Sequence, residues 1–138
     1  MNRLNDSLRR IMDCDKPLLG ELFYAKLFAA YPAARVFFEH TNMQMQVHIL
    51  INGLQVAVAL AGENYPAARS YLKVVGHRHY QRQIPTELYP LFCDAMLATL
   101  REFHTGEWTP ELEQEWRRAL EASVAAMLEG YTREPVFY

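Results

Sequence analysis

Histidine is the residue type in this sequence best suited to bind a metal ion, and His77 and His79 lie only two positions apart. On a helix this spacing places the two side chains about 200° apart, so they cannot bind one ion from the same face. His40, His48 and His104 are scattered, and the sequence lacks the His-x-x-x-His and Cys-x-x-Cys spacings of zinc sites. The histidines therefore argue against a zinc site, and at most one of the pair points inward.

A single inward histidine can instead hold haem iron from one side, provided that an apolar pocket lies opposite. Two polar residues are candidates for the other side of such a pocket. Tyr24 lies within an apolar stretch, where a buried hydroxyl needs a hydrogen-bond partner, and Gln46 opens the most apolar stretch of the chain. From the pattern alone, an ordinary core tyrosine and a solvent-facing glutamine are equally good interpretations.

Other classes of function find no support in the sequence. It contains no nucleophile elbow, phosphate-binding glycine loop or paired carboxylates. Cys14 and Cys93 are far apart, which favours two reduced packing residues over a disulfide framework. The 14 basic and 16 acidic residues give a net charge of −2 without a long basic stripe, which argues against a nucleic-acid partner.

No segment of the sequence has the character of a targeting signal or membrane anchor. The first ten residues lack the apolar run of a signal peptide, and the most apolar stretch, residues 47–61, still contains His48, Asn52 and Gln55. We therefore expect a cytoplasmic protein that is not embedded in a membrane.

Apolar residues recur at helical spacing along almost the whole chain, which predicts an all-α fold and a single domain over residues 1–138. Turn and cap residues predict helices over about 4–12, 17–31, 43–61, 66–80, 84–103 and 110–131, with a short segment at 33–38. Tyr24 then lies on the second helix, Gln46 at the start of the third, and His79 near the end of the fourth.

Five segments in this order resemble bacterial single-domain globins and the globin domain of flavohaemoglobins. They are Leu22–Phe28, Phe37–Phe38, Gln46, Gly76–His79 and Pro85–Tyr89. Their order and spacing match across nearly the whole chain, and Trp116 falls in the expected last helix. The resemblance implies the globin fold, a three-on-three helical sandwich around haem b (iron protoporphyrin IX).

The resemblance also implies roles for particular residues. His79 is the expected proximal iron ligand, and His77 faces away. On the opposite, distal side, Tyr24 and Gln46 are expected to contact the gas ligand, although Gln44 competes with Gln46 because the alignment needs a short gap before it. The remaining residues expected at the cofactor are Phe38, Leu50 and Tyr89.

One position departs from the flavohaemoglobin pattern. There, a glutamate on the last helix accepts a hydrogen bond from the proximal histidine and is held by the tyrosine that Tyr89 matches. The corresponding residue here is Tyr131, and Glu129 or Glu134 can replace it only if the helix register slips. Without a carboxylate the imidazole donates less electron density to iron, which puts in doubt the electronic push that family members use in peroxidase-like or dioxygenase chemistry. Nitric oxide dioxygenase or peroxidase-like activity with a separate electron donor stays open.

The leading functional hypothesis is a globin that binds O2 reversibly, binds NO, and detoxifies NO when an external reductase supplies electrons. The chain lacks the length for flavin and nicotinamide domains of its own. A haem-based gas sensor and a haem-free globin-like interaction domain are the alternatives. The sequence leaves open the physiological ligand, the oligomeric state, and whether Tyr24, Gln46 or His48 reaches the sixth coordination position of the iron.

Overall fold

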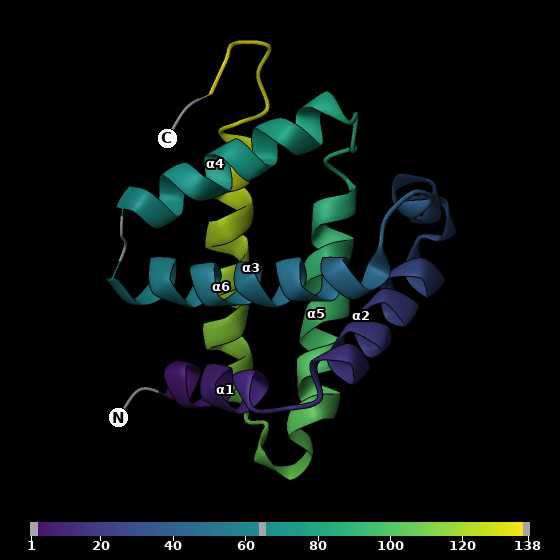
Figure 1. The fold of residues 1–138 in the computed structure, drawn as a ribbon. Helices are drawn as coiled ribbons and strands as arrows, with labels where there is room; N and C mark the ends of the chain where they lie inside the picture. Colours follow the sequence, from purple (N-terminus) through teal and green to yellow (C-terminus); the bar gives the residue numbers. More distant parts are fainter. Residues whose placement is uncertain (1–2, 64–65, 137–138) are drawn as a thin grey trace.

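The computed structural model describes residues 3–63 and 66–136, and its regular structure in those ranges is entirely helical (Figure 1). This confirms the predicted all-α fold. The helices are α1 (Arg3–Met12), α2 (Lys16–Ala30), α3 (Met43–Glu63), α4 (Pro66–Gln81), α5 (Leu88–His104) and α6 (Pro110–Leu128), with 3-10 helices η1 (Pro32–Phe38) and η2 (Thr105–Glu107).

Side-chain caps begin three of these helices where the sequence places a short polar residue. Asp15 accepts a hydrogen bond from the backbone N–H of Leu18 at the start of α2, at 3.2 Å. Thr109 does the same for Leu112 at the start of α6, at 3.1 Å. Asn42 caps the start of α3 and so fixes where this long apolar helix begins.

The helices form two crossed layers (Figure 1). The pair α5 and α6 runs side by side, while α3 crosses in front of it. At one end of the pair α4 packs across α6, at the other end α1 packs on α6, and α2 packs on α5. Because α3 and α4 are consecutive and both pack on α6, residues on their facing sides are brought close to each other.

The core is divided into two apolar clusters. The larger one surrounds Trp116 and Phe23, both almost completely buried, and draws residues from α1, α2, α3, α5 and α6. The smaller one lies between α4 and the last turns of α3 and α6 and contains Leu60, Leu72, Tyr89, Ala126 and Met127. Burial of these side chains is the main force that holds the helices together.

One helix in the described ranges, α3 at Met43–Gly62, is long and apolar enough to cross a membrane by length and composition alone. Its inner side carries Val47, Leu50, Leu54 and Ala57, which are buried in the larger cluster. A core helix of a soluble protein passes the same test, so the length and composition of α3 are weak evidence for a membrane span.

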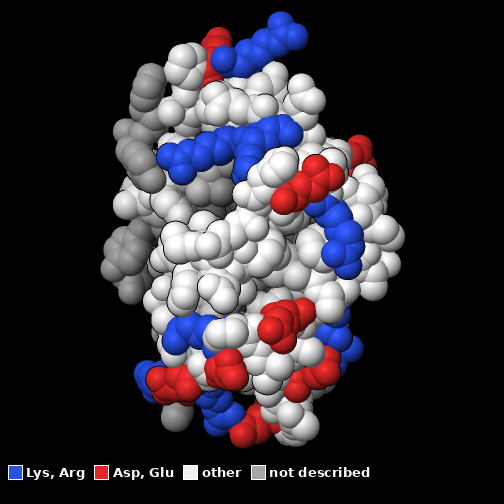
Figure 2. Space-filling model, turned by 45° about the vertical axis from the view of Figure 1, so that its right-hand side comes forward, with Lys and Arg blue, Asp and Glu red and all other residues white. Residues whose placement is uncertain are grey.

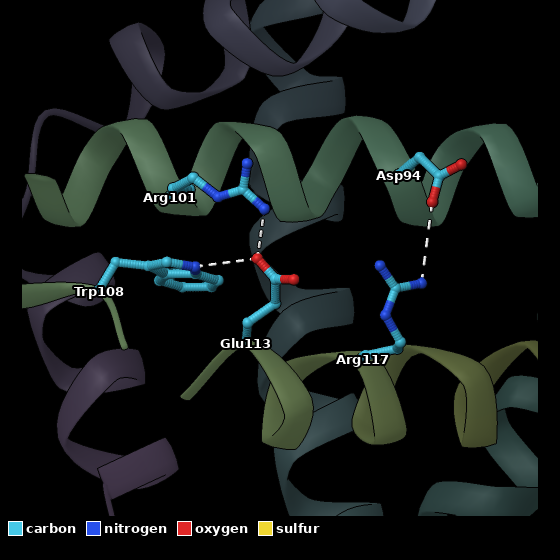
Figure 3. A network of polar contacts seen from close by, with 5 residues as sticks. All are labelled: Asp94, Arg101, Trp108, Glu113 and Arg117. Carbon is cyan, nitrogen blue, oxygen red and sulfur yellow. Dashed lines mark hydrogen bonds and ion pairs between the residues drawn. The ribbon is translucent and has the colours of Figure 1, made fainter. Parts of the chain in front are cut away.

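Exposed polar contacts join α5 to α6 (Figure 3). The carboxylate of Glu113 accepts hydrogen bonds from Arg101 and from the indole N–H of Trp108, and these bonds hold the pKa of Glu113 below its ordinary value. Further along, Arg117 lies 3.8 Å from Asp94. Such solvent-exposed pairs contribute about 0–1 kcal/mol each, so they add little to the stability of the fold.

The helix ends differ from the sequence prediction in two places that matter for the site. The fifth helix begins at Leu88 instead of residue 84, because residues 84–87 form a turn in which Leu88 N–H bonds the carbonyl of Pro85. The sixth helix ends at Leu128, and Tyr131 lies in the turn that follows it. Gly62 lies inside α3 instead of ending it.

Candidate functional site

His79 lies near the end of α4 with most of its side chain shielded from water. Its Nδ1 is 2.9 Å from the hydroxyl of Tyr89 on α5. Burial, assisted by the nearby positive charge of Arg82, lowers the pKa of His79 to about 4. The imidazole is therefore neutral at pH 7, which is the form that binds a metal ion.

The hydroxyl of Tyr89 also contacts the hydroxyl of a second tyrosine. Tyr131 lies with its hydroxyl 3.0 Å from that of Tyr89 and 3.0 Å from the carbonyl oxygen of Ile84. The two rings meet edge to face at 5.9 Å. His79, Tyr89, Tyr131 and Ile84 thus form one continuous series of hydrogen bonds, which we call the proximal relay.

Tyr131, in the turn after α6, contacts the hydrogen-bond partner of His79, which is Tyr89. Glu129 pairs instead with Arg69 at 2.7 Å, and Glu134 is exposed. His77 is also directed toward this turn, where its Nδ1 lies 3.1 Å from the carbonyl oxygen of Gly130. It forms no part of the proximal relay.

Two glycines allow α4 and the end of α6 to approach backbone to backbone. A Cβ atom at Gly76 would lie 1.8 Å from the carbonyl oxygen of Met127, and one at Gly130 would lie 2.1 Å from that of Lys73. No side chain fits at either position. This contact fixes the helix that carries His79 against the turn that carries Tyr131.

Tyr24 and Gln46 form a second polar pair, between α2 and α3. The tyrosine is only 6% exposed, and its hydroxyl is hydrogen-bonded to the Gln46 side chain. Burial raises the pKa of Tyr24 to about 12, so the phenol keeps its proton at physiological pH. Gln44 is exposed. Of the two glutamines, Gln46 is therefore the one that meets Tyr24.

Apolar residues surround this pair. The ring of Phe38 meets the ring of Tyr24 at 5.3 Å, and Phe28 contacts both. Leu50, one turn after Gln46, is buried in the same large cluster as Tyr24. His48 is exposed on α3, so the structure does not bring it to the pair.

The two polar arrangements belong to different apolar clusters. Tyr24 and Leu50 lie in the larger cluster, and Tyr89 lies in the smaller one. In the described ranges no group of three or more His, Cys, Asp or Glu side chains is placed to hold a bare metal ion. A neutral histidine whose Nδ1 is already bonded, together with a hydroxyl–amide pair in apolar surroundings, is a donor set that fits haem.

A third polar cluster was not predicted from the sequence. Ser7 on α1 lies with its Oγ 2.6 Å from Nε2 of His104 on α5, and it accepts a hydrogen bond from the indole N–H of Trp116 on α6 at 2.9 Å. All three residues are buried. The signal was present, because Ser7 shares a helix face with Leu4 and Ile11, but a serine between apolar residues does not reveal its distant partners.

Comparisons with known proteins show which family this chain resembles. The Globin family model matches residues 21–128. An anaerobic nitrite reductase, HBII, of Casuarina glauca is 27% identical over 81% of this chain and 80% of its own length. A flavohemoprotein of Halalkalibacterium halodurans is 24% identical over 86% of this chain, which spans only 31% of that protein.

A solved structure extends the likeness to three dimensions. It is a Pseudomonas aeruginosa protein described as structurally highly homologous to a human hemoglobin, with a TM-score of 0.79 and 27% identity. The match covers 94% of this chain and 95% of that one. The chain therefore belongs to the globin family and has the globin fold, which implies that it binds haem.

Proposed function

We propose that this globin binds haem b through Nε2 of His79 and binds O2 and NO reversibly on the opposite, distal face. The observation that carries the proposal is that Tyr24, in the larger apolar cluster, is hydrogen-bonded to Gln46. Tyr89, the hydrogen-bond partner of His79, lies in the smaller cluster. Phe38 and Leu50 supply apolar contact beside the pair.

The chain's own residues account for tight gas binding. Haem supplies, when bound, an iron ion with an open position for a diatomic ligand. Burial keeps the Tyr24 phenol protonated, so it can donate a hydrogen bond to a ligand that has gained partial negative charge. Gln46 holds the phenol in place, and the apolar surroundings strengthen the bond. Slow O2 release follows.

The proximal relay favours binding over peroxide chemistry. Its members are two phenols and a backbone carbonyl, so it contains no negative charge. A neutral partner leaves the Nδ1 proton on His79 and keeps the imidazole a moderate electron donor to iron. We therefore expect peroxidase-like activity to be weak.

NO detoxification is the enzymatic part of the proposal. The conversion NO + O2 + e⁻ → NO3⁻ needs one electron per turnover, which an external reductase in the cytoplasm would supply. The flavohemoprotein relatives extend well beyond the region that this chain matches. The proposal assigns the electron supply to a separate donor protein, and the charge of α4 suggests where that donor would reach the haem.

The surface of α4 suits an acidic donor protein. Residues 64–86 contain four basic residues and no carboxylate. Three of the four, Lys73, Arg78 and Arg82, form no ion pair with a described carboxylate. Figure 2 shows a band of blue side chains across the upper part of one face, with red side chains beside it and mixed charges below it. Opposite charge would draw the donor to the helix that carries His79.

Absorption spectra test the gas-binding proposal directly. The purified protein is loaded with haem and measured as ferric, dithionite-reduced, and reduced with CO, NO or O2. We expect a Soret band that shifts with each ligand. If haem addition gives no Soret band, the haem-free interaction domain replaces this proposal. A Soret band that no gas shifts would mean that the distal face is closed.

A further inference from the structure

The three contacts of the proximal relay can all be hydrogen bonds at once in only one arrangement. The carbonyl oxygen of Ile84 can only accept, so the single hydroxyl proton of Tyr131 is donated to it, at 3.0 Å. The oxygen of Tyr131 then accepts from Tyr89, and the oxygen of Tyr89 accepts from Nδ1–H of His79.

We propose that Tyr131 is a positioning residue that sets the electron donation of His79 through Tyr89. The Tyr131 oxygen accepts a hydrogen bond from the Tyr89 hydroxyl, so that every bond of the relay is donated away from the iron site. This inference rests on the proposed role of His79 as the iron ligand. Tyr131 does not touch His79, so its influence passes through the hydroxyl of Tyr89.

The position of Tyr131 is fixed by backbone packing. It follows Gly130, whose Cα faces the carbonyl of Lys73 so closely that a Cβ would not fit. The Tyr131 N–H bonds the carbonyl of Leu128 at 3.1 Å, and its ring meets the rings of Tyr80 and Tyr89 edge to face. The phenol is therefore held at the end of the relay by contacts that do not involve its hydroxyl.

Two consequences follow from the direction of the relay. Because the Tyr89 hydroxyl donates a hydrogen bond to Tyr131, its oxygen becomes a better acceptor for Nδ1–H, and the imidazole becomes a better ligand. Because Ile84 cannot take up a proton, the relay cannot remove the Nδ1 proton from His79. Tyr131 thus gives the histidine a strong hydrogen bond without creating an imidazolate.

The test is the iron–histidine stretching band of the haem-loaded ferrous protein, measured by resonance Raman, together with the ferric/ferrous midpoint potential. Tyr131→Phe removes the acceptor hydroxyl and keeps the ring. We expect a lower stretching frequency and a more positive potential. Tyr80→Phe is the matched control, because Tyr80 touches the Tyr131 ring without joining the relay, and it should change neither quantity.

A double-mutant cycle shows whether the effect passes through Tyr89. Tyr89→Phe should lower the frequency further and speed haem loss about 10-fold or more. Adding Tyr131→Phe in that background should then have no additional effect. If Tyr131→Phe fails to retain haem while Tyr89→Phe retains it, the proposal is overturned, because an effect that passes through the Tyr89 hydroxyl cannot exceed that of removing this hydroxyl.

The outcomes separate this inference from the proposed function. A wild-type protein without an iron–histidine band contradicts the role of His79 and hence the proposed function. A normal wild-type band that is unchanged in Tyr131→Phe, or a double variant in which the two effects simply add, overturns the role of Tyr131 alone.

Discussion

The hydroxyl of Tyr24 is hydrogen-bonded to the side chain of Gln46, which joins α2 to α3. The tyrosine is almost fully enclosed and keeps its proton, since burial raises its pKa to about 12. A hydroxyl in this state has a single proton to donate. If a gas ligand binds beside it, that proton can turn toward the ligand while Gln46 continues to hold the oxygen.

Replacing Tyr24 by Phe should speed O2 dissociation. A hydrogen bond to a partly charged acceptor contributes about 1.5–3 kcal/mol, so the rate should rise about 10-fold to 150-fold in stopped-flow measurements. Tyr31→Phe, at the end of the same helix, is the matched control. A Tyr24→Phe off-rate equal to that of the wild type would remove the proposed role of Tyr24.

Gly76→Ala should destabilise the protein by roughly 1–3 kcal/mol, because the new Cβ would clash with the backbone of Met127. Gly53→Ala is the matched control. Gly53 also lies inside a helix, but nothing lies within 4 Å of its Cβ position, so this change should stabilise the protein by up to about 1 kcal/mol. Urea unfolding measures both, and equal effects would contradict the close contact of α4 with α6.

The buried His104 should make the protein less stable in mild acid. Burial, and then Arg10, lower the pKa of His104 below its ordinary value of 6.5. Above pH 6.5 the residue is neutral in both the folded and unfolded states. As the pH falls below that value, the unfolded chain takes up a proton that the folded chain resists, and the free energy of unfolding decreases.

The measurement compares urea unfolding at about pH 7.5 and pH 5 in wild type and His104→Gln. We expect a smaller loss on acidification in the variant, whereas His48→Gln, which changes an exposed histidine, should behave as the wild type does. Identical pH dependence in all three proteins would show that His104 takes up its proton as readily in the folded state.

The basic surface of α4 should govern reduction by an acidic donor protein. Charge reversal in the double variant Arg78→Glu, Arg82→Glu should slow haem reduction by about 10-fold or more at low ionic strength, with the difference shrinking as salt is added. The control is Arg118→Glu, an exposed arginine on α6. If Arg118→Glu slows haem reduction equally, the net charge of the protein, and not the surface of α4, controls the encounter with the donor protein.

The fold was predictable from the sequence because it depends on local signals. Helical apolar spacing, caps such as Asp15 and Thr109, and the segment containing His79 all carry their information within a few residues. The globin fold is confirmed. The single domain over residues 1–138, which includes positions outside the described ranges, and the roles of the site residues stay predictions.

Other features depend on contacts between distant segments. Tyr131 was expected in the last helix, but the approach of Gly130 to α4 ends α6 earlier and places the phenol in a turn. The same contact brings Tyr131, and not Glu129 or Glu134, to Tyr89. The sequence left the choice between these three residues open. The partners of Ser7 lie 97 and 109 positions away, beyond the reach of any local pattern.

The most direct measurement of the central claim, that His79 holds the haem iron, is a ligand-rescue experiment. His79→Gly is loaded with haem and its spectrum is recorded with and without imidazole, beside His77→Gly as the matched change two residues away. We expect His79→Gly to lose the wild-type ferrous spectrum and its normal gas binding, imidazole to restore both, and His77→Gly to resemble the wild type. A wild-type spectrum in His79→Gly without imidazole would contradict the account.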